Sequence, residues 1–181
     1  MIEIWCDGAA SHNGRADAIG GWGWMVQFPN EFPILSGGRK DGATNQQMEL
    51  AAMINALYFV QGELDRKNEF VLSNEPIKVY TDSAYIANCY KQNWYRAWET
   101  NGWVNSKKEP VANREQWEYL VPFFKRSNIE IIKVKGHANN FGNQVVDKLA
   151  VAARTMDGFK FSEYKQNLQK EVNEIFKEDL F

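Results

Sequence analysis

The sequence predicts an α/β fold in which a mixed β-sheet carries helices on its faces. The first observation is a run of strand-like segments at the start of the chain, residues 2–6, 19–28 and 32–40, rich in apolar residues and glycine. The second is a change of pattern after residue 44, where apolar residues recur at helical steps of three and four. The third is a later alternation of strands and helices, which is typical of βαβ units and adds parallel strands to the antiparallel start.

Each predicted element follows from its local pattern. Glycines within 19–28 suit a strand that neighbours approach closely, and Pro122 cannot donate a helical hydrogen bond. The later elements are expected as a helix at 45–61, a polar loop at 63–76, a strand at 77–81, a helix at 83–98, a helix at 114–124 interrupted near Pro122, a strand at 129–136 and a helix at 143–154.

Composition restricts the class of protein. The 181 residues favour one domain with an appended element, and 44% hydrophobic residues supply a packed core. The net charge of -2 argues against a nucleic-acid protein, although a local basic patch stays compatible with it. No apolar run approaches the roughly 20 residues of a membrane span. The start of the chain does not resemble a signal peptide, because Glu3 and Asp7 interrupt its apolar residues. Cys6 and Cys89 form no metal-binding pattern, so two reduced thiols in a cytoplasmic protein are expected.

Four acidic residues on separate segments form the candidate site. They are Asp7 and Asp82, expected at the ends of two strands, and Glu49 and Asp147, expected within two helices. Taken singly, each is compatible with a surface carboxylate or a helix cap. Four carboxylates that meet need cations to neutralise them, and Mg²⁺ is a hard cation that also binds phosphate oxygens. Two such ions about 4 Å apart can stabilise the attacking and leaving oxygens of a phosphodiester.

Four segments resemble, in the same order, those of type 1 ribonuclease H: "DGAASHN", "TNQQMELAAMINAL", "VYTDSAYI" and "VKGHANNFGNQVVDKLA". The resemblance covers residues 1–154 and implies a ribonuclease H domain with a five-stranded mixed sheet. It implies that Asp7, Glu49, Asp82 and Asp147 are catalytic and bind Mg²⁺, for which Mn²⁺ can substitute. The implied reaction is endonucleolytic hydrolysis of the RNA strand of RNA–DNA hybrids by water, leaving 5′-phosphate and 3′-hydroxyl ends.

His137 and Gln144 flank the last of these acids. Without context, His137 is compatible with an ordinary polar loop residue. By resemblance, His137 is the family's mobile-loop histidine, which helps to deprotonate the nucleophilic water or assists the leaving group. Gln144 departs from the family, which often has "NE" where this chain has "NQ". This change predicts slower turnover or an altered metal preference.

The resemblance also implies a set of residues along the minor groove of the hybrid, where 2′-hydroxyls are exposed. These residues are Gly8, Asn13, Thr44, Asn45, Gln46 and Ser83. Thr44 and Asn45 are also ordinary helix N-cap residues, and the two roles are compatible because a helix N-terminus binds phosphate.

Residues 91–110 match the position of the basic handle that grips the DNA strand in bacterial members. By resemblance, Trp94, Lys107 and Lys108 contact the substrate. The simpler interpretation is that the tryptophans of this segment pack on the body of the protein, and we expect this for Trp98. The run "WETNGW" is less basic than the usual "WKKRGW", which predicts a weaker grip.

Residues 155–181 lie outside the resemblance and predict an amphipathic helical extension. Phe161, Tyr164, Leu168, Val172 and Ile175 fall at steps of three and four. Docking on the chain's own domain is expected, and a dimer or partner contact is the alternative. The terminal "EDLF" faintly resembles peptides that bind replication clamps.

Two other functional classes stay open. One is a non-catalytic module that binds hybrids or double-stranded RNA, and the other is a DNA nuclease domain of the transposase or resolvase type. The presence of all four acids argues against the first. The combination of "TNQQMEL" with "KGHANN" argues against the second.

Overall fold

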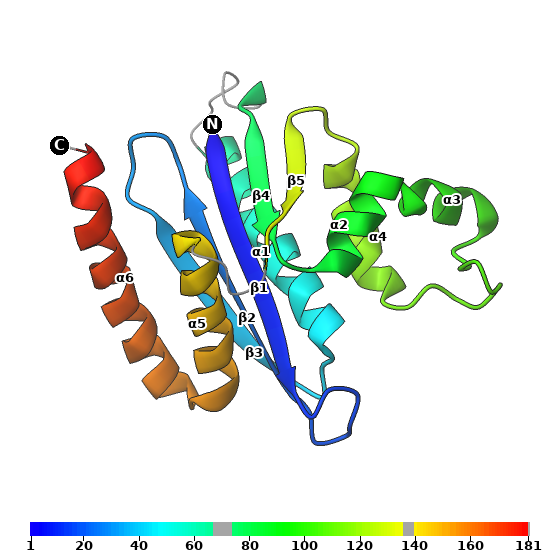
Figure 1. The fold of residues 1–181 in the computed structure, drawn as a ribbon, viewed down its shortest axis with the longest axis horizontal. Coiled ribbons are helices and arrows are strands. Elements are labelled where there is room, and N and C mark those ends of the chain that lie inside the picture. Colours follow the sequence, from blue (N-terminus) through cyan, green and yellow to red (C-terminus); the bar gives the residue numbers. More distant parts are fainter. Residues whose placement is uncertain (67–73, 136–139, 181) are drawn as a thin grey trace.

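The computed structural model describes residues 1–66, 74–135 and 140–180 (Figure 1). The strands are β1 (Ile2–Ser11), β2 (Ile19–Gln27), β3 (Ile34–Asp41), β4 (Ile77–Thr81) and β5 (Ile129–Lys133). The helices are α1 (Asn45–Arg66), α2 (Ala84–Gln92), α3 (Trp94–Asn101), α4 (Arg114–Phe124), α5 (Phe141–Thr155) and α6 (Gly158–Leu180). No helix among the described residues is long and apolar enough to cross a membrane.

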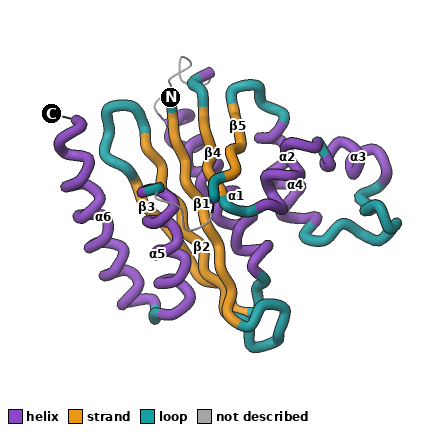
Figure 2. Tube along the Cα trace, viewed as in Figure 1, coloured by secondary structure: helices purple, strands orange, loops and turns teal. Residues whose placement is uncertain are grey.

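The strands form the predicted five-stranded mixed sheet, in the order β3-β2-β1-β4-β5 (Figure 2). β1, β2 and β3 pair antiparallel, whereas β4 pairs parallel with both β1 and β5. The antiparallel meander and the later parallel strands therefore both occur, as the sequence predicted.

The two faces of the sheet carry separate hydrophobic clusters. The larger cluster joins the sheet to α1, α2, α3 and α4, and it includes Leu50, Tyr95 and Trp117. The smaller cluster lies between the sheet, α5 and α6, and it includes Met25 and Leu149. Helices thus cover both faces, and α5 lies over β1, β2 and β3 with α6 beside it, next to the edge strand β3 (Figure 1).

The first strand is longer than predicted. β1 continues to Ser11, so the prediction that Asp7 ends this strand is wrong. The physical reason is the pairing with β2, which runs from Glu3 to Ser11 and holds the second half of β1 in the sheet. β5 is shorter than predicted and ends at Lys133.

The predicted helix at 83–98 is two helices. Asn93 takes a left-handed conformation, with φ of 55°, and its N–H donates to the carbonyls of Cys89 and Tyr90. Asparagine tolerates this conformation better than most residues, so α2 ends there and α3 begins at Trp94 in a new direction.

The predicted interruption at Pro122 does not occur, because α4 continues to Phe124. Proline removes one backbone hydrogen bond near the end of the helix. The buried side chains of Val121, Phe123 and Phe124 hold this last turn against the core.

The C-terminal helix docks on its own domain, as expected. Leu168 and Val172 of α6 are buried in the smaller cluster. Gln169 accepts a hydrogen bond from the Leu35 backbone N–H at 3.0 Å and donates to the Pro33 carbonyl at 2.7 Å. One side chain therefore satisfies two backbone groups at the outer edge of β3. Ile175, expected on the buried face, is 55% exposed.

Candidate active site

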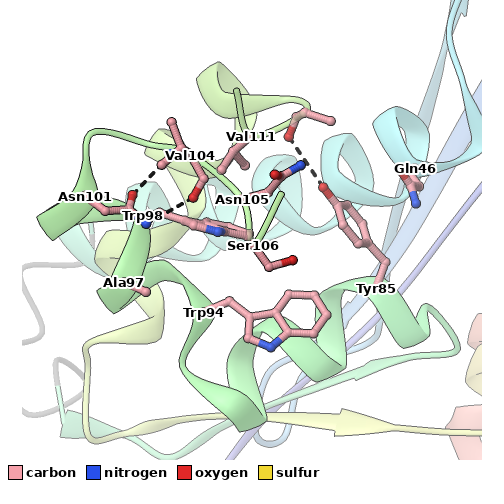
Figure 3. A pocket seen from close by; sticks show the side chains of 11 residues that line it. Gln46, Tyr85, Trp94, Ala97, Trp98, Asn101, Val104, Asn105, Ser106 and Val111 are labelled. Carbon is pink, nitrogen blue, oxygen red and sulfur yellow. Dashed lines mark hydrogen bonds between the residues drawn. The ribbon is translucent and has the colours of Figure 1, made fainter. Parts of the chain in front are cut away.

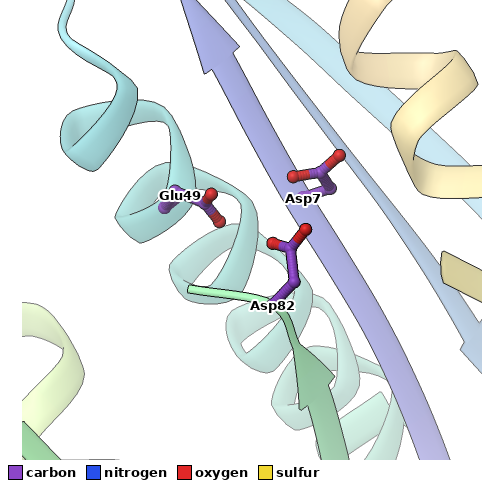
Figure 4. A group of neighbouring side chains, drawn as sticks. All are labelled: Asp7, Glu49 and Asp82. Carbon is purple, nitrogen blue, oxygen red and sulfur yellow. The ribbon is translucent and has the colours of Figure 1, made fainter. Parts of the chain in front are cut away.

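Strand register brings the first two acids together. On the parallel strands β1 and β4, Trp5 lies opposite Tyr80, so the same register carries Asp7 toward Asp82 two residues later. β4 ends at Thr81, and Asp82 follows it directly, as predicted. Figure 4 shows both carboxylates at this point, one from the middle of β1 and one from the end of β4.

Glu49 reaches the same point from α1. A reciprocal pair of hydrogen bonds fixes the start of this helix: Gln47 N–H donates to Thr44 Oγ1 at 3.2 Å, and Thr44 N–H donates to Gln47 Oε1 at 3.0 Å. Oxygens of Asp7, Glu49 and Asp82 lie within 4.8 Å of one another. The structure therefore brings three of the four predicted acids into one cluster.

Gly8 lets α1 come this close. A Cβ atom built on Gly8 would lie 2.2 Å from the Met48 carbonyl carbon and 2.3 Å from the Glu49 nitrogen. Real side chains do not tolerate such distances, so a residue larger than glycine would push the helix away from β1. Gly8 is buried, and its N–H donates to Asp7 Oδ1 at 2.8 Å. The absence of a side chain at Gly8 thus allows Glu49 of α1 to approach Asp7 of β1.

Burial and mutual repulsion perturb the acids. Burial, followed by the charges of Asp82 and Asp147, raises the pKa of Asp7 to about 7. Burial raises the pKa of Glu49 well above its ordinary value, and the charges of Asp7 and Asp82 add to this effect. The carboxylates thus carry an electrostatic cost that a cation would relieve.

The donor set fits a hard divalent cation. Glu49 Oε2 is buried and has no hydrogen-bond partner among the described residues. Buried charged oxygens normally have partners, and a cation bound by the cluster would supply one. Closely spaced carboxylate oxygens are the ligand type that Mg²⁺ and Mn²⁺ favour.

Asp147 lies in α5, beside the cluster. It is half-buried, and its charge and a side-chain hydrogen bond with Asp7 contribute to the raised pKa of Asp7. The start of α5 is capped by Asn140, whose Oδ1 accepts from the Asn143 N–H at 3.2 Å. Gln144, in the first turn, is exposed. The predicted catalytic His137 lies outside the described residues.

Two asparagines tie the first loop to the start of α1. Asn13 Oδ1 accepts a hydrogen bond from the Asn45 N–H at 2.9 Å, and Asn45 Oδ1 accepts from the Ala10 N–H at 2.6 Å. Both asparagines are exposed, and so is Gln46 beside them. The predicted groove residues of these two segments therefore lie together on one surface.

Ser83 and Thr44 have clear structural roles. Ser83 is 8% exposed and is the N-cap of α2, where its side chain accepts from the Ile86 N–H at 3.4 Å. Thr44 caps α1 through its hydrogen bond with Gln47. The expected N-cap role of Thr44 is therefore confirmed, whereas Asn45 is the first residue of α1. The same role accounts for Ser83 without a substrate contact.

A cavity of about 500 Å³ lies between the start of α1, the helices α2 and α3, and the loop that follows α3 (Figure 3). Trp94, Trp98 and Tyr85 supply its aromatic surface. Trp98 is buried and packs on Trp117 at a ring distance of 5.4 Å, so its expected packing on the body is confirmed. Trp94 is half-buried and lines the same cavity.

Sequence reasoning missed Tyr85 and Asn105 of this cavity. The Tyr85 hydroxyl accepts a hydrogen bond from Trp117 Nε1 at 2.9 Å, which fixes its ring. Asn105 Oδ1 accepts from the backbone N–H groups of Lys107 and Glu109. Tyr85 lies in "TDSAYI", so its closeness in sequence to Asp82 was the one available signal.

Lys107 and Lys108 project from a tight turn. Lys108 has a left-handed φ of 60°, and its N–H donates to the Asn105 carbonyl at 3.0 Å. Both lysines are exposed, and neither forms an ion pair with another of the described residues. The turn thus presents two positive charges beside the aromatic cavity.

Comparison with known proteins agrees with this architecture. A family model described as RNase H matches residues 1–155. A protein of Syntrophomonas wolfei named Ribonuclease H is 39% identical over 149 residues, covering 82% of this chain and 92% of its own. One of Acetivibrio thermocellus with the same name is 41% identical over 151 residues, covering 82% and 91%.

Solved structures share the fold at low identity. LC9-RNase H1, described as a type 1 RNase H with the type 2 active-site motif, aligns with a TM-score of 0.67 at 22% identity, covering 90% of this chain and 79% of that one. LC11-RNase H1 in complex with RNA/DNA hybrid aligns with a TM-score of 0.56 at 20% identity, covering 82% and 95%. The match to the family model, the identity to the relatives and the acid cluster lead to one conclusion: this chain belongs to the ribonuclease H family.

Proposed function

We propose that this protein is an endoribonuclease that hydrolyses the RNA strand of RNA–DNA hybrids. The observation that carries the proposal is the cluster of Asp7, Glu49 and Asp82, with oxygens within 4.8 Å of one another and one Glu49 oxygen that has no partner among the described residues. The family membership and the relatives named Ribonuclease H support the same activity. The expected products carry 5′-phosphate and 3′-hydroxyl ends.

The acids act as metal ligands in this proposal. Asp7, Glu49, Asp82 and Asp147 would hold Mg²⁺, or Mn²⁺ in its place, in a two-ion site. When bound, the ions supply positive charge to the attacking and leaving oxygens of the phosphodiester. The four side chains fix the position of that charge. The raised pKa of Asp7 means that cation binding also displaces a proton near neutral pH.

His137 assists proton transfer in this proposal, which rests on the "KGHANN" motif alone. An imidazole titrates near neutral pH and can take a proton from water or give one to the leaving group. General acid–base groups typically contribute about 10²–10⁴-fold in rate. Replacement of His137 by alanine is therefore expected to slow cleavage without abolishing it.

The hybrid would lie across two surfaces that flank the acids. The exposed asparagines Asn13 and Asn45 are suited to 2′-hydroxyls of the RNA strand, because amide groups both donate and accept. The cavity with Trp94 and the turn with Lys107 and Lys108 are suited to stacking and to phosphates of the DNA strand. A hybrid is the bound nucleic acid in the structure of the neighbour LC11-RNase H1.

A cleavage assay tests the proposal. The protein is incubated with end-labelled RNA–DNA hybrid, with Mg²⁺ or with EDTA, beside double-stranded RNA and double-stranded DNA of the same sequence. We expect RNA-strand cleavage of the hybrid alone, and only with Mg²⁺. Cleavage of the DNA duplex would instead indicate a DNA nuclease, and binding without cleavage would indicate a non-catalytic module.

Asn substitutions at the acids make the assay specific to the site. Asp7→Asn and Asp82→Asn each remove a charged ligand with little change of shape, so cleavage should be abolished while hybrid binding persists. Asp65→Asn, on the exposed end of α1, is the matched control. Full activity in either ligand variant would contradict the assignment of the metal site.

A further inference from the structure

The helix α6 lies beyond the segment that the family model matches, yet its end contacts the start of α5. The family model ends at residue 155, and α6 spans Gly158–Leu180. α6 runs back along α5, and the Phe176 ring lies 5.9 Å from the Phe141 ring, centroid to centroid. Phe141 is the first residue of the helix that carries Asp147.

The length of α6 makes this contact possible. α5 has 15 residues and α6 has 23, and a helix rises about 1.5 Å per residue. A shorter return helix would cover the far end of α5 and leave its start without a contact from the extension. Figure 1 shows the two helices side by side, with the end of α6 beyond the level at which α5 begins.

The start of α5 also rests on the sheet. A Cβ atom built on Gly142 would lie 2.4 Å from the Trp5 ring, so the helix backbone lies directly on that indole. Trp5 itself stacks on Tyr80, with centroids 5.1 Å apart and planes 17° apart. The first turn of α5 is thus held between Trp5 of β1 and Phe176 of α6.

This packing bears on the acid cluster because α5 is the element that brings Asp147 to it. The first turn of a helix is its weakest part, since its N–H groups lack partners within the helix. At this start, Asn140 supplies a cap for one such group, and the two rings limit lateral movement. Outer contacts that orient metal ligands can matter nearly as much as the ligands themselves.

We propose that Phe176 is a positioning residue: by packing on Phe141, it holds the first turns of α5 against Trp5 and so fixes Asp147 relative to Asp7. The cleavage readout of this inference rests on the proposed function. The structural readout, exchange of backbone amides in α5, does not.

The test compares three alanine variants of α6 in the full chain. Phe176→Ala removes the ring contact. Ile175→Ala changes the neighbouring residue, which is 55% exposed. Val172→Ala removes a buried α6 side chain of the smaller cluster, 1% exposed, and loosens the helix elsewhere. Phe176→Tyr keeps the ring and serves as the rescue. Phe176→Leu keeps apolar bulk without the ring and replaces Phe176→Ala in both measurements if Phe176→Ala fails to fold.

Two quantities are measured well below the unfolding temperature of each variant. Hydrogen–deuterium exchange reports opening of the first two turns of α5. The Mg²⁺ concentration that gives half-maximal cleavage reports the metal site. For Phe176→Ala we expect faster amide exchange in the first two turns of α5. We also expect the Mg²⁺ concentration for half-maximal cleavage to rise by about 10-fold, the lower end of effects seen for outer-shell partners of metal ligands. Ile175→Ala and Phe176→Tyr should resemble the wild type in both.

The outcomes separate the alternatives. If Phe176→Ala matches Ile175→Ala in both measurements, the proposal is overturned. If Val172→Ala shifts the Mg²⁺ midpoint as much as Phe176→Ala, general loosening of α6 explains the effect, and a specific role for Phe176 is overturned. If the wild type does not cleave hybrid at all, the proposed function fails. In that case, amide exchange in α5 and Mg²⁺ affinity measured by calorimetry still decide whether Phe176 positions α5.

Discussion

Asp7 illustrates how one residue links stability to function. It is 7% exposed, and its pKa is raised to about 7 by burial and by neighbouring acids. A carboxyl with a raised pKa keeps its proton in the folded protein at pH values where the unfolded chain has lost it. Its contribution to stability is therefore present below the unfolded pKa of 3.8 and is lost as pH rises through about 7.

The first prediction concerns the stability of Asp7→Asn in EDTA. The amide cannot ionise, so the variant should gain stability relative to the wild type as pH rises from 5 to 8, by about 1–4 kcal/mol at 1.36 kcal/mol per pKa unit. Urea unfolding at both pH values measures this change. Asp65→Asn, which is exposed, should show no such trend. A stability difference that is independent of pH would contradict the electrostatic explanation.

The second prediction concerns Gly8. Gly8→Ala places a methyl group against the backbone of Met48 and Glu49, so α1 must move away from β1. We expect a loss of cleavage of at least about 10²-fold, in line with the effect of misplacing a catalytic group by about 1 Å. Single-turnover cleavage at saturating Mg²⁺ measures this loss.

Gly62→Ala in α1 is the matched control for Gly8→Ala in β1. Among the described residues, no atom would lie within 4 Å of the added Cβ, and alanine stabilises helix interiors by roughly 0.5–1 kcal/mol relative to glycine. The control should therefore be fully active and slightly more stable. Equal activity of the two variants would show that close packing at Gly8 is dispensable.

At the scale of elements, each functional side chain depends on how its helix or strand is anchored. Asp82 directly follows β4, and Glu49 lies on a helix with a reciprocal cap at its start. Residues 91–110 are anchored by aromatic packing, in which Trp98 contacts the rings of Trp94, Trp103 and Trp117. The turn within this segment carries Lys107 and Lys108 on this rigid base.

The third prediction concerns this turn. Each phosphate contact contributes about 0.7–0.9 to the slope of log K against log salt. Replacing Lys107 and Lys108 together by alanine should flatten the slope and raise KM, with kcat near the wild-type value because the acids are untouched. Binding titrations at several salt concentrations measure the slope. An unchanged slope would mean that the lysines do not contact the hybrid.

Trp94, at the start of α3, should behave differently from the two lysines. Stacking on a base contributes roughly 1–3 kcal/mol and is largely insensitive to salt. Trp94→Ala should therefore weaken binding equally at every salt concentration. If its effect disappeared at high salt, charge and not stacking would account for the contribution of this segment.

At the scale of the whole molecule, we propose that residues 1–154 form the ribonuclease H domain and that 155–181 form an extension folded onto it. The extension shares a hydrophobic cluster with α5 and β3. It also covers the outer edge of the sheet through the two hydrogen bonds of Gln169. An open strand edge can pair with another chain, so we expect this cover to limit self-association.

The fourth prediction is that a chain ending at Thr155 is less stable and associates with itself. Removal of α6 takes away Leu168 and Val172, each worth about 1.5–3 kcal/mol when fully buried. The unfolding free energy should fall by about 3 kcal/mol or more, and size-exclusion chromatography should detect oligomers. Phe159→Ala, at an 81% exposed site, is the control and should leave both measurements unchanged. A truncated chain with wild-type stability would contradict a structural role for the extension.

The local patterns in the sequence were sufficient for most elements, and the resemblance of four segments to type 1 ribonuclease H identified the acids. Periodicity identified α1 and α6, α5 was also predicted as a helix, and the "TN" at the start of α1 indicated its capped start. Asp7, Glu49 and Asp82 were predicted together, and they do meet. These features are readable because helix periodicity, capping and side-chain chemistry depend on neighbours in the sequence.

Tertiary structure decided what depends on partners distant in the sequence. β1 continues past Asp7 because β2 pairs with it, and the register between β1 and β4 aligns Asp7 with Asp82. Gly8 is needed because the backbone of α1, which is distant in the sequence, lies where any side chain at this position would have to go. Likewise, Phe176 and not Ile175 faces Phe141, because the path of α6 over α5 selects its buried side. No local pattern encodes these contacts, since each arises from the packing of segments whose spacing only the complete fold determines.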